Sequence, residues 1–338
     1  MQIPSTMKAA AINRFGPPSA IAVHERPVPK PGADELLIRI DVAGVGSWDP
    51  AIRDGSWPPK RARFPLVLGT DGTGVVVGKG AKVKRFRVGD RVYAYEFGNP
   101  KGGFYAEYVA VKAKHAARVP RQLRPLEAGA AVPVALTALQ GVVNELDLRR
   151  GQVVLIFGAS GAVGSLAVQF AKQRGARVLA TASGKRATAL VRRLGADAVV
   201  DARRDESIKR LWKLAPHGID AALAFAGGER LERCLDVMRP GGRVAFPNGI
   251  EPGAPRRRRS VRCSSYDLDV TPRWFEKLHR SITKTPIHVP IAAVFPLSRA
   301  ADAHRRLARG AIRGSMVLRV RHPISASTSR RVDRRGGE

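Results

Sequence analysis

The sequence predicts an α/β protein in which a doubly wound parallel sheet is inserted into a β-rich domain. From Gly151 onward, strand-like and helix-like runs alternate at the spacing of a parallel sheet with helices on both faces. Residues 1–120 instead hold short β-like runs separated by Gly and Pro, which is typical of a barrel-like domain. We expect the last strand-like run, 315–320, to return to the β-rich part and so enclose the sheet domain.

Changes in composition and in the pattern of strand-like and helix-like runs predict the domain boundaries. The β-rich domain comprises 1–122 plus 268–321, and the parallel-sheet domain comprises 123–267. The remaining segment, 322–338, is polar, basic and rich in Ser, and we expect it to be a disordered tail.

The elements of the parallel-sheet domain can be assigned one by one. A helical run is expected first, over 123–146. Apolar runs then predict strands at 152–157, 177–181, 198–200, 219–225 and 242–246. Amphipathic runs between them predict helices at 162–174, 185–194, 205–214 and 229–238. The alternation stops near residue 265, and a further helix is expected at 271–282.

Length and composition bound the class of protein. The 338 residues suit two domains, and the hydrophobic fraction of 44% is ordinary for a globular chain. No apolar run approaches the roughly 20 residues that span a bilayer, and the N-terminal residues lack a secretory layout. We therefore expect a cytoplasmic protein with no membrane partner. Cys234 and Cys263 belong to no Cys or His cluster, which excludes a disulfide scaffold and a four-cysteine zinc site.

The net charge of +31 results from 59 Lys and Arg against 28 acidic residues. Such a field attracts polyanions and acidic ligands. The basic residues are nevertheless scattered, with dense runs only at 256–259 and in the tail. A specific nucleic-acid site needs clustered charge with stacking aromatic residues, and aromatic residues make up only 6% of the chain. A nucleic-acid partner stays open on these grounds but is not the favoured interpretation.

A glycine-rich turn joins the strand at 152–157 to the helix that follows it. Gly158, Gly161 and Gly164 recur at three-residue spacing, where a strand ends and a helix begins. Glycine at the turn lets a ligand approach the backbone, and glycine in the first helical turn lets the helix pack closely on the strand. The helix N-terminus adds unpaired N–H groups and a positive dipole end. The turn therefore predicts a diphosphate cradle formed by Ser160, Gly161, Ala162, Val163 and Gly164.

The end of the second strand indicates which dinucleotide binds. An NAD site places an acidic residue about 20 residues after the turn, and Ala182 occupies that position here. Ser183, Lys185 and Arg186 follow, which suit a 2′-phosphate and predict NADPH as the cofactor. The alternative is that the two cations simply begin a solvated helix, but cations are unfavourable at a helix N-terminus.

Seven stretches together give the chain a family resemblance over residues 7–320. It resembles the zinc-independent branch of the medium-chain dehydrogenase/reductase superfamily, the quinone oxidoreductase or zeta-crystallin-like type. The resemblance implies a GroES-like catalytic domain with an inserted Rossmann domain. The stretches are AGVGSWDPAIRDG (43–55), PLVLGTDGTGVV (65–76), RFRVGDRVYAY (85–95), GGFYAEYV (102–109), GASGAVG (158–164), LGADAVVDAR (194–203) and MRPGGRVAF (238–246).

The resemblance also implies that no metal is bound. Zinc-dependent members carry their ligands at the positions of Gly46 and Thr70 and near Pro133, and none of these side chains would hold zinc. Alcohol oxidation then lacks its Lewis acid. A quinone or an α,β-unsaturated carbonyl can accept hydride without a metal, so the implied enzyme is an NADPH-dependent reductase of such acceptors.

The family resemblance, together with the positions of residues at the ends of predicted strands, suggests the catalytic, substrate and cofactor residues. For catalysis, Tyr105 and Asp49 are the candidates for acid chemistry. The predicted substrate pocket contains Trp48, Trp57 and Tyr95. Thr137, Gly227, Asn248 and Gly249 are expected beside the cofactor, in addition to the glycine turn and the cations.

Two alternative functions stay open. One is an RNA-binding zeta-crystallin-like protein with weak reductase activity, which the basic runs motivate. The other is an enoyl-thioester reductase of the same superfamily. The resemblance further implies a homodimer joined along the edge of the parallel sheet, near 241–249 and 261–268.

Overall fold

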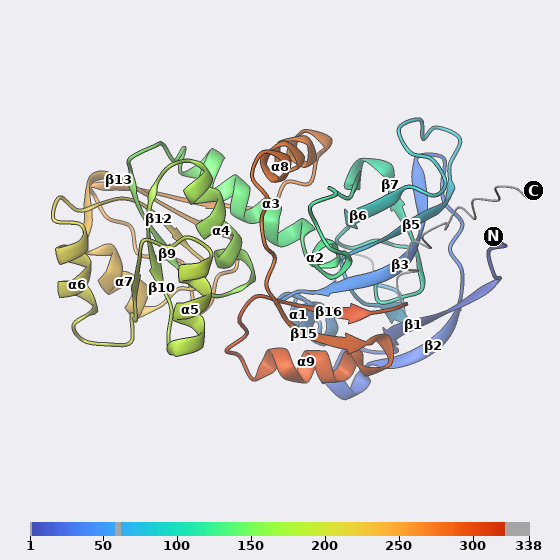
Figure 1. Ribbon diagram of the computed structural model, residues 1–338. Coiled ribbons are helices and arrows are strands. Elements are labelled where there is room, and N and C mark those ends of the chain that lie inside the picture. Colours follow the sequence, from blue (N-terminus) through green and yellow to red (C-terminus); the bar gives the residue numbers. More distant parts are fainter. Residues whose placement is uncertain (1, 58–61, 322–338) are drawn as a thin grey trace, which may run out of the picture.

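The computed structural model describes residues 2–57 and 62–321, and it consists of two lobes side by side (Figure 1). The predicted tail, 322–338, lies outside the described residues. One lobe, here called the β-rich lobe, carries two sheets, and the other, the parallel-sheet lobe, carries one. The predicted domain boundaries stay a proposal, because the helices between the lobes pack against both.

A seven-stranded sheet dominates the β-rich lobe, in the order β15-β16-β3-β5-β6-β8 with β7 paired to β3. The last strand of the chain, β16, pairs antiparallel with β3, so the predicted return of the C-terminal strand is confirmed. The strands are β3 (Glu35–Val45), β5 (Asp71–Lys79), β6 (Arg91–Tyr95), β7 (Tyr108–Lys112), β8 (Ala116–Arg118), β15 (Ile291–Pro296) and β16 (Ser315–Arg319).

A second, three-stranded sheet completes this lobe, in the order β2-β1-β4. Helices α1 and α9 belong to the same lobe, and α9 lies between β15 and β16 in sequence. The elements are β1 (Thr6–Ile12), β2 (Ala22–Pro27), β4 (Leu66–Val67), α1 (Asp49–Asp54) and α9 (Ala300–Ala308).

The parallel-sheet lobe has the predicted doubly wound architecture. Its six strands lie in the order β11-β10-β9-β12-β13-β14, and every pair is parallel. The strands are β9 (Val153–Phe157), β10 (Arg177–Thr181), β11 (Ala198–Val200), β12 (Ile219–Ala224), β13 (Met238–Pro247) and β14 (Val261–Tyr266). The helices are α4 (Ala162–Gln173), α5 (Lys185–Arg193), α6 (Ser207–Leu214) and α7 (Glu229–Leu235).

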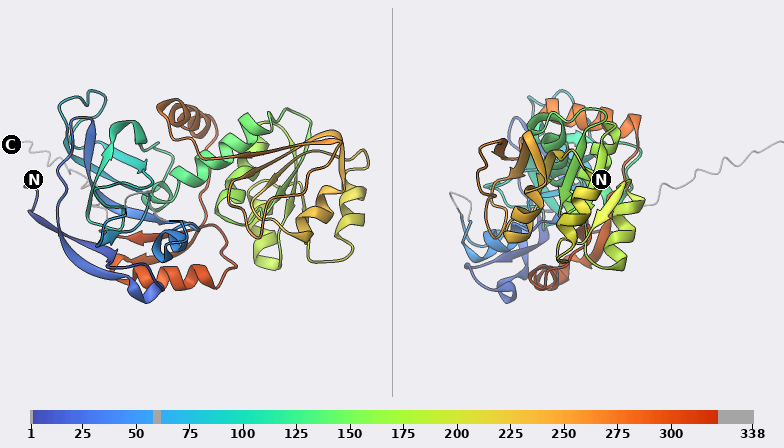
Figure 2. Two further views of the ribbon diagram at one scale, coloured as in Figure 1. Left: turned by 180° about the vertical axis from the view of Figure 1, so that it is seen from behind. Right: turned by 90° about the vertical axis from the view of Figure 1, so that its left-hand side faces the viewer.

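Helices cover both faces of this sheet, and its central strand β9 is accordingly apolar throughout. Val154 and Ile156 of β9 pack into the core that α4 and α5 complete, whereas Leu155 and Phe157 pack into the core with α6 and α7. Figure 2 shows the helices on the two sides of the sheet when it is viewed along the long axis of the molecule. Strand β14 forms one edge of the sheet, and the predicted dimer contact there stays a prediction.

Two predicted helices differ from the observed ones. The helix predicted at 229–238 ends at Leu235, and Met238 already pairs with Ile219 in the sheet. The helix ends early because the chain joins the sheet at this point, where the Val237 carbonyl accepts a hydrogen bond from the Ile219 N–H at 2.9 Å. The helix predicted at 123–146 is divided into three parts, α2 (Pro125–Gly129), α3 (Val132–Gln140) and a π-helical segment (Gly141–Glu145).

The region between the lobes is formed by α3 and α8 (Pro272–Lys284), which pack together (Figure 1). Their apolar residues belong to the same core as α4, which extends from the parallel sheet to Val42 and Tyr93 of the β-rich lobe. The two lobes therefore share buried apolar surface. Within 2–57 and 62–321, no helix has the length and apolar character to cross a bilayer.

Replacing Gly164 with Ala should destabilise the parallel-sheet lobe. A Cβ at this position would lie 2.2 Å from the carbonyl oxygen of Gly158 and 2.8 Å from the Cα of Ala159, both of which are backbone atoms. We expect the free energy of unfolding to fall by about 1–3 kcal/mol, measured by denaturant titration. Gly78→Ala is the control, since its Cβ would make ordinary contacts, the nearest 3.5 Å from Leu37. Equal stability of the two variants would contradict the close packing.

Candidate functional site

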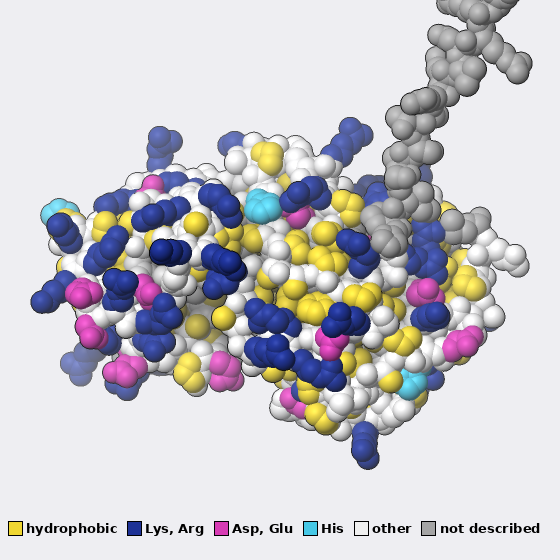
Figure 3. All heavy atoms as spheres, turned by 60° about the horizontal axis from the view of Figure 1, so that its bottom comes forward, with side chains coloured by type: hydrophobic (Ala, Val, Ile, Leu, Met, Phe, Trp, Pro, Cys, Tyr) yellow, Lys and Arg dark blue, Asp and Glu magenta, His cyan; other side chains and the backbone are white. Residues whose placement is uncertain are grey.

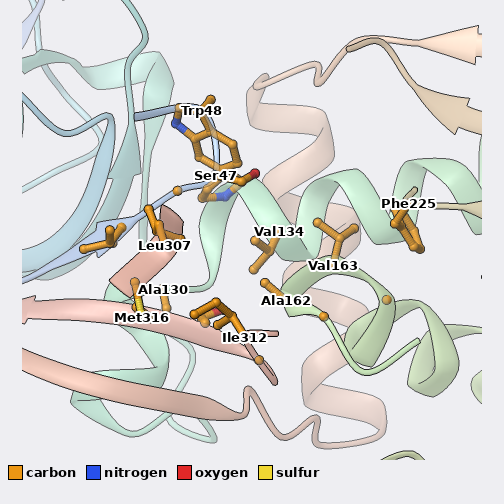
Figure 4. Close-up of a pocket in the computed structure, with 18 of the residues that line it drawn as sticks. Ser47, Trp48, Ala130, Val134, Ala162, Val163, Phe225, Leu307, Ile312 and Met316 are labelled. Atoms are coloured by element: carbon orange, nitrogen blue, oxygen red, sulfur yellow. The ribbon is translucent and has the colours of Figure 1, made fainter. Parts of the chain in front are cut away.

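A cavity of about 300 Å³ opens between the two lobes, and both contribute to its wall (Figure 4). The β-rich lobe supplies the end of β3, the following residues to Trp48, the first residues of β16 and Asp71. The parallel-sheet lobe supplies the glycine turn, the first residues of α4 and Phe225 after β12. The remaining wall comes from α3 and the residue Ala130 before it, from the end of α9 with Leu307, and from Ile312 in the segment that follows.

The glycine turn lies at the carboxyl end of β9, as the sequence predicts. Gly158 has a φ of +81°, which favours glycine, and its N–H donates to the Thr181 hydroxyl at 2.9 Å. Gly161 is the N-cap of the twelve-residue helix α4, and no side chain caps this end. The N–H groups of the first turn have no partner within the helix, so they can bind an anionic group placed in the cavity.

A segment far along the chain closes against this turn. The Gly314 N–H donates to the Ser160 carbonyl at 2.9 Å, and Gly161 and Gly314 form an isolated β-bridge. Ser315 follows in the cavity wall, and its buried hydroxyl has no hydrogen-bond partner among the described residues. The role of this segment in the site is not predictable from local sequence, because it contacts a turn about 150 residues earlier in the chain.

The predicted 2′-phosphate site has a mixed charge. Lys185 and Arg186 are exposed at the start of α5, and no ion pair is found for them within the described ranges. The Ser183 hydroxyl, however, donates to Asp201 at 2.8 Å. Asp201 follows β11, the neighbour of β10 in the sheet, and also pairs with Arg203 at 2.8 Å. The hydrogen bond from Arg203 is the main reason why the pKa of Asp201 lies below its usual value.

The other residues predicted to contact the cofactor are not part of the cavity wall. Thr137 is half-buried, and its carbonyl accepts a hydrogen bond from Tyr266 at 3.0 Å. The space above Gly227 is filled, because a Cβ there would lie 1.9 Å from the Gly253 carbonyl oxygen. Asn248 donates its backbone N–H to Tyr266, and Gly249 is exposed.

The three predicted pocket residues occupy different environments. Trp48 lines the cavity, and its indole N–H donates to the Thr70 hydroxyl at 2.8 Å. Trp57 is 51% exposed and stacks on Phe97, with ring centroids 4.6 Å apart. Neither Trp57 nor the mostly buried Tyr95 is part of the cavity wall.

The two predicted catalytic residues form a buried cluster behind the cavity. The Tyr105 hydroxyl donates to Asp49 at 2.7 Å, and His304 lies 3.4 Å from the same hydroxyl. Burial raises the pKa of Asp49 to about 7 and lowers that of His304 to about 3. Both Tyr105 and Asp49 are fully buried, and neither lines the cavity, so this geometry gives them no contact with a molecule bound there.

Two family models match the chain. The alcohol dehydrogenase GroES-like domain matches residues 32–121, and the zinc-binding dehydrogenase domain matches residues 162–256. Among curated relatives, alcohol dehydrogenase 1 of Emericella nidulans is 33% identical over 75% of this chain and 79% of its own length. The chain belongs to the medium-chain dehydrogenase/reductase family.

Further relatives connect the chain with the quinone oxidoreductase-like members of this family. The quinone oxidoreductase of Mus musculus is 29% identical over 92% of this chain and 97% of its own length. A quinone oxidoreductase structure from Coxiella burnetii has a TM-score of 0.80 at 29% identity, covering 94% of this chain and all of its own. An NAD-dependent alcohol dehydrogenase structure reaches 0.86 at 30% identity, covering 93% of this chain and all of its own.

The structure places the three positions at which the family resemblance implies zinc ligands in zinc-dependent members. Gly46 and Pro133 line the cavity and have no side chain that binds a metal, and the Thr70 hydroxyl is engaged by Trp48. Among the residues that the structure describes, no three His, Cys, Asp or Glu side chains gather as a metal site would require. The cavity wall of this family member is instead mostly apolar, apart from Asp71 and two serines.

Thr181→Val should weaken dinucleotide binding, because it removes the acceptor that fixes the Gly158 N–H and so loosens the glycine turn. An unpaired buried donor costs about 1–3 kcal/mol, so we expect the Kd for NADPH, measured by its fluorescence, to rise about fivefold or more. Thr73→Val is the matched control, since that buried hydroxyl donates to the Val92 carbonyl at 2.8 Å away from the turn. If both variants bind NADPH like the wild type, the glycine turn is not the binding site of the cofactor.

Proposed function

We propose that the protein is an NADPH-dependent, zinc-independent reductase that transfers hydride to a quinone or an α,β-unsaturated carbonyl compound. The observation that carries this proposal is the continuity of one cavity, which extends from the glycine turn to Trp48 without a metal-ligating set of side chains in its wall. A dinucleotide held at the turn and an acceptor held beside Trp48 would share this space.

The residues present fit a nicotinamide dinucleotide. The unpaired N–H groups at the start of α4 suit its diphosphate, and Gly158 and Gly161 leave room for close approach, because a Cβ at either would meet no atom closer than 3.4 Å. When bound, the nicotinamide supplies the hydride. Val134, Val163 and Phe225 make the adjoining wall apolar and exclude water from the transfer (Figure 4).

A conjugated acceptor suits this wall better than an alcohol. Alcohol oxidation by the zinc-dependent relatives depends on a Lewis acid, whose ligand positions are Gly46, Thr70 and Pro133 here. An enone or a quinone delocalises the incoming charge itself. Its flat, apolar body matches a wall of Trp48, Val134 and neighbouring aliphatic side chains.

The choice of NADPH rests on the cations that follow β10. Lys185 and Arg186 have no acidic partner among the described residues and are free to pair with a 2′-phosphate. One observation favours NADH instead, namely the Asp201 carboxylate beside Ser183, which could accept hydrogen bonds from a ribose diol. Arg203 neutralises that carboxylate in part, and we therefore keep NADPH as the proposed cofactor.

The basic surface gives less support to an RNA-binding function. Lys and Arg side chains are spread over both lobes on the face that Figure 3 shows, with hydrophobic side chains between them. Within the run at 256–259, Arg258 pairs with Glu232 at 2.8 Å and with Asp236 at 3.0 Å. Part of the densest basic run is thus neutralised within the chain itself.

The double variant Lys185→Ala/Arg186→Ala should lose affinity for NADPH but not for NADH. Removing two charge-assisted contacts to the phosphate should raise the NADPH Kd about tenfold or more. Arg192→Ala/Arg193→Ala is the matched control, because it removes the same charge from the last turn of the same helix. Equal losses in the two double variants would indicate a general field effect and would leave the phosphate site unsupported.

An acceptor panel should separate the proposed activity from its alternatives. We expect the purified protein to oxidise NADPH with a quinone or a simple enone, followed at 340 nm, and not to reduce NADP⁺ with primary alcohols. An enoyl thioester serves as a further arm of the panel. Turnover of an alcohol alone, or of no acceptor despite NADPH binding, would contradict the proposed function.

A further inference from the structure

Asp71 is the only titratable side chain in the described part of the cavity wall. It is the first residue of β5, it is 2% exposed, and it lies on the wall formed by the β-rich lobe. The reduction of a conjugated acceptor requires a proton as well as a hydride. Tyr105 and Asp49, the two residues predicted for acid chemistry, are buried and do not line the cavity.

The carboxyl group of Asp71 is held in place by its neighbours. It packs on the backbone of Gly44, where a Cβ would lie 2.2 Å from Oδ2, so only glycine leaves room for it. Its Oδ1 accepts a long hydrogen bond of 3.4 Å from the Thr70 hydroxyl, which itself accepts from the indole N–H of Trp48. Within the described ranges no hydrogen bond is found for Oδ2, which leaves this oxygen available to a bound molecule.

The surroundings of Asp71 favour its protonated form. Burial raises its pKa well above the usual value, and the negative charge of Asp49 raises it further. Tyr95 and Tyr105 are the other titratable groups that face this pair of acids, and burial raises the pKa of each of them as well. Behind Tyr105 lie His304, which burial keeps neutral, and Arg53, 3.2 Å from the His304 ring. Asp71 therefore holds a proton more tightly than an exposed carboxyl group does, in a position from which it can be donated into the cavity.

We propose that Asp71 is the catalytic proton donor of the reduction, an inference that rests on the proposed function. Hydride addition to the β-carbon of an enone would form a C–H bond there while a C–H bond of the reduced nicotinamide breaks, so that the nicotinamide is oxidised and the enone reduced. The electron pair of the C=C bond moves toward the carbonyl group. The O–H bond of Asp71 then breaks, and its proton bonds to the α-carbon while the carboxylate keeps the electron pair. Water reprotonates the carboxylate after the product leaves.

A nitroalkene substituted at its α-carbon separates the two steps, because hydride addition gives a nitronate that takes up a proton at carbon only slowly in water. With the wild type in D₂O, we expect the nitroalkane to form directly and to carry one stereospecific deuterium at the α-carbon. In Asp71→Asn, NADPH oxidation with the nitroalkene should fall less than about tenfold, but nitronate absorbance should accumulate. Turnover of an enone, which needs the proton, should fall about 100-fold or more.

Asp41→Asn is the matched control, since Asp41 is a buried acid of β3 that pairs with Arg91 at 3.0 Å outside the cavity. It should release no nitronate. Asp71→Ser is a second variant that lacks the acid, and either variant suffices if it melts cooperatively and binds NADPH like the wild type. Nitroalkane formation without nitronate in a folded Asp71 variant would overturn the proposal.

The wild type alone supplies an independent test. If its nitroalkane carries α-deuterium without stereochemical preference, protonation occurs in solution and the proposal is again overturned. Failure of the proposed function is distinguishable from both results, because the wild type would then oxidise NADPH with neither the nitroalkene nor the enone.

Discussion

The close crossing of α4 over the end of β9 is the contact on which the site depends. Gly164 lies so near the Gly158 carbonyl that a Cβ would meet it at 2.2 Å. This approach brings the open N-terminus of a twelve-residue helix to the edge of the cavity, where its N–H groups and dipole face an incoming anion. Thr181 fixes the same turn from the neighbouring strand. A looser crossing would move the anion site away from the wall that holds the acceptor.

Local sequence rules predict this half of the site well. The strand, the glycine turn and the helix are adjacent in the chain. The residues between Val153 and Gln173 are therefore sufficient to predict them. The parallel order of the sheet and the return of β16 to β3 also follow from alternation and from the last strand-like run. Helix ends were less predictable, since α7 ends at Leu235, where the chain begins to pair with β12, and its amphipathic pattern does not show this tertiary contact.

The cavity wall formed by the β-rich lobe could not be predicted from the sequence, because tertiary contacts assemble it. Asp71 begins β5 and Ser315 begins β16. These two strands are far apart in the chain and lie on either side of β3 in one sheet. Asp201 was missed for a related reason. In an NAD site, the acidic residue that binds the ribose is expected at the end of β10, where this chain has Ala182. The Asp201 carboxylate instead follows β11, the strand that pairs with β10. Residue type alone likewise could not tell that Tyr105 and Asp49 are buried behind the cavity rather than exposed to it.

The two buried acids Asp49 and Asp71 show how hydrogen-bond partners give chemically identical groups different acidities. Asp49 accepts hydrogen bonds from the Tyr105 hydroxyl at 2.7 Å and from the Gly46 N–H at 3.0 Å, and both stabilise its charged form. Asp71 has only the long contact from Thr70, and a charge on Asp49 makes its own ionisation harder. Two carboxyl groups with such unequal partners separate in acidity, as paired acids do in many active sites. The acid that holds its proton more tightly is the one that lines the cavity, so the arrangement places that proton where a reduced acceptor would need it.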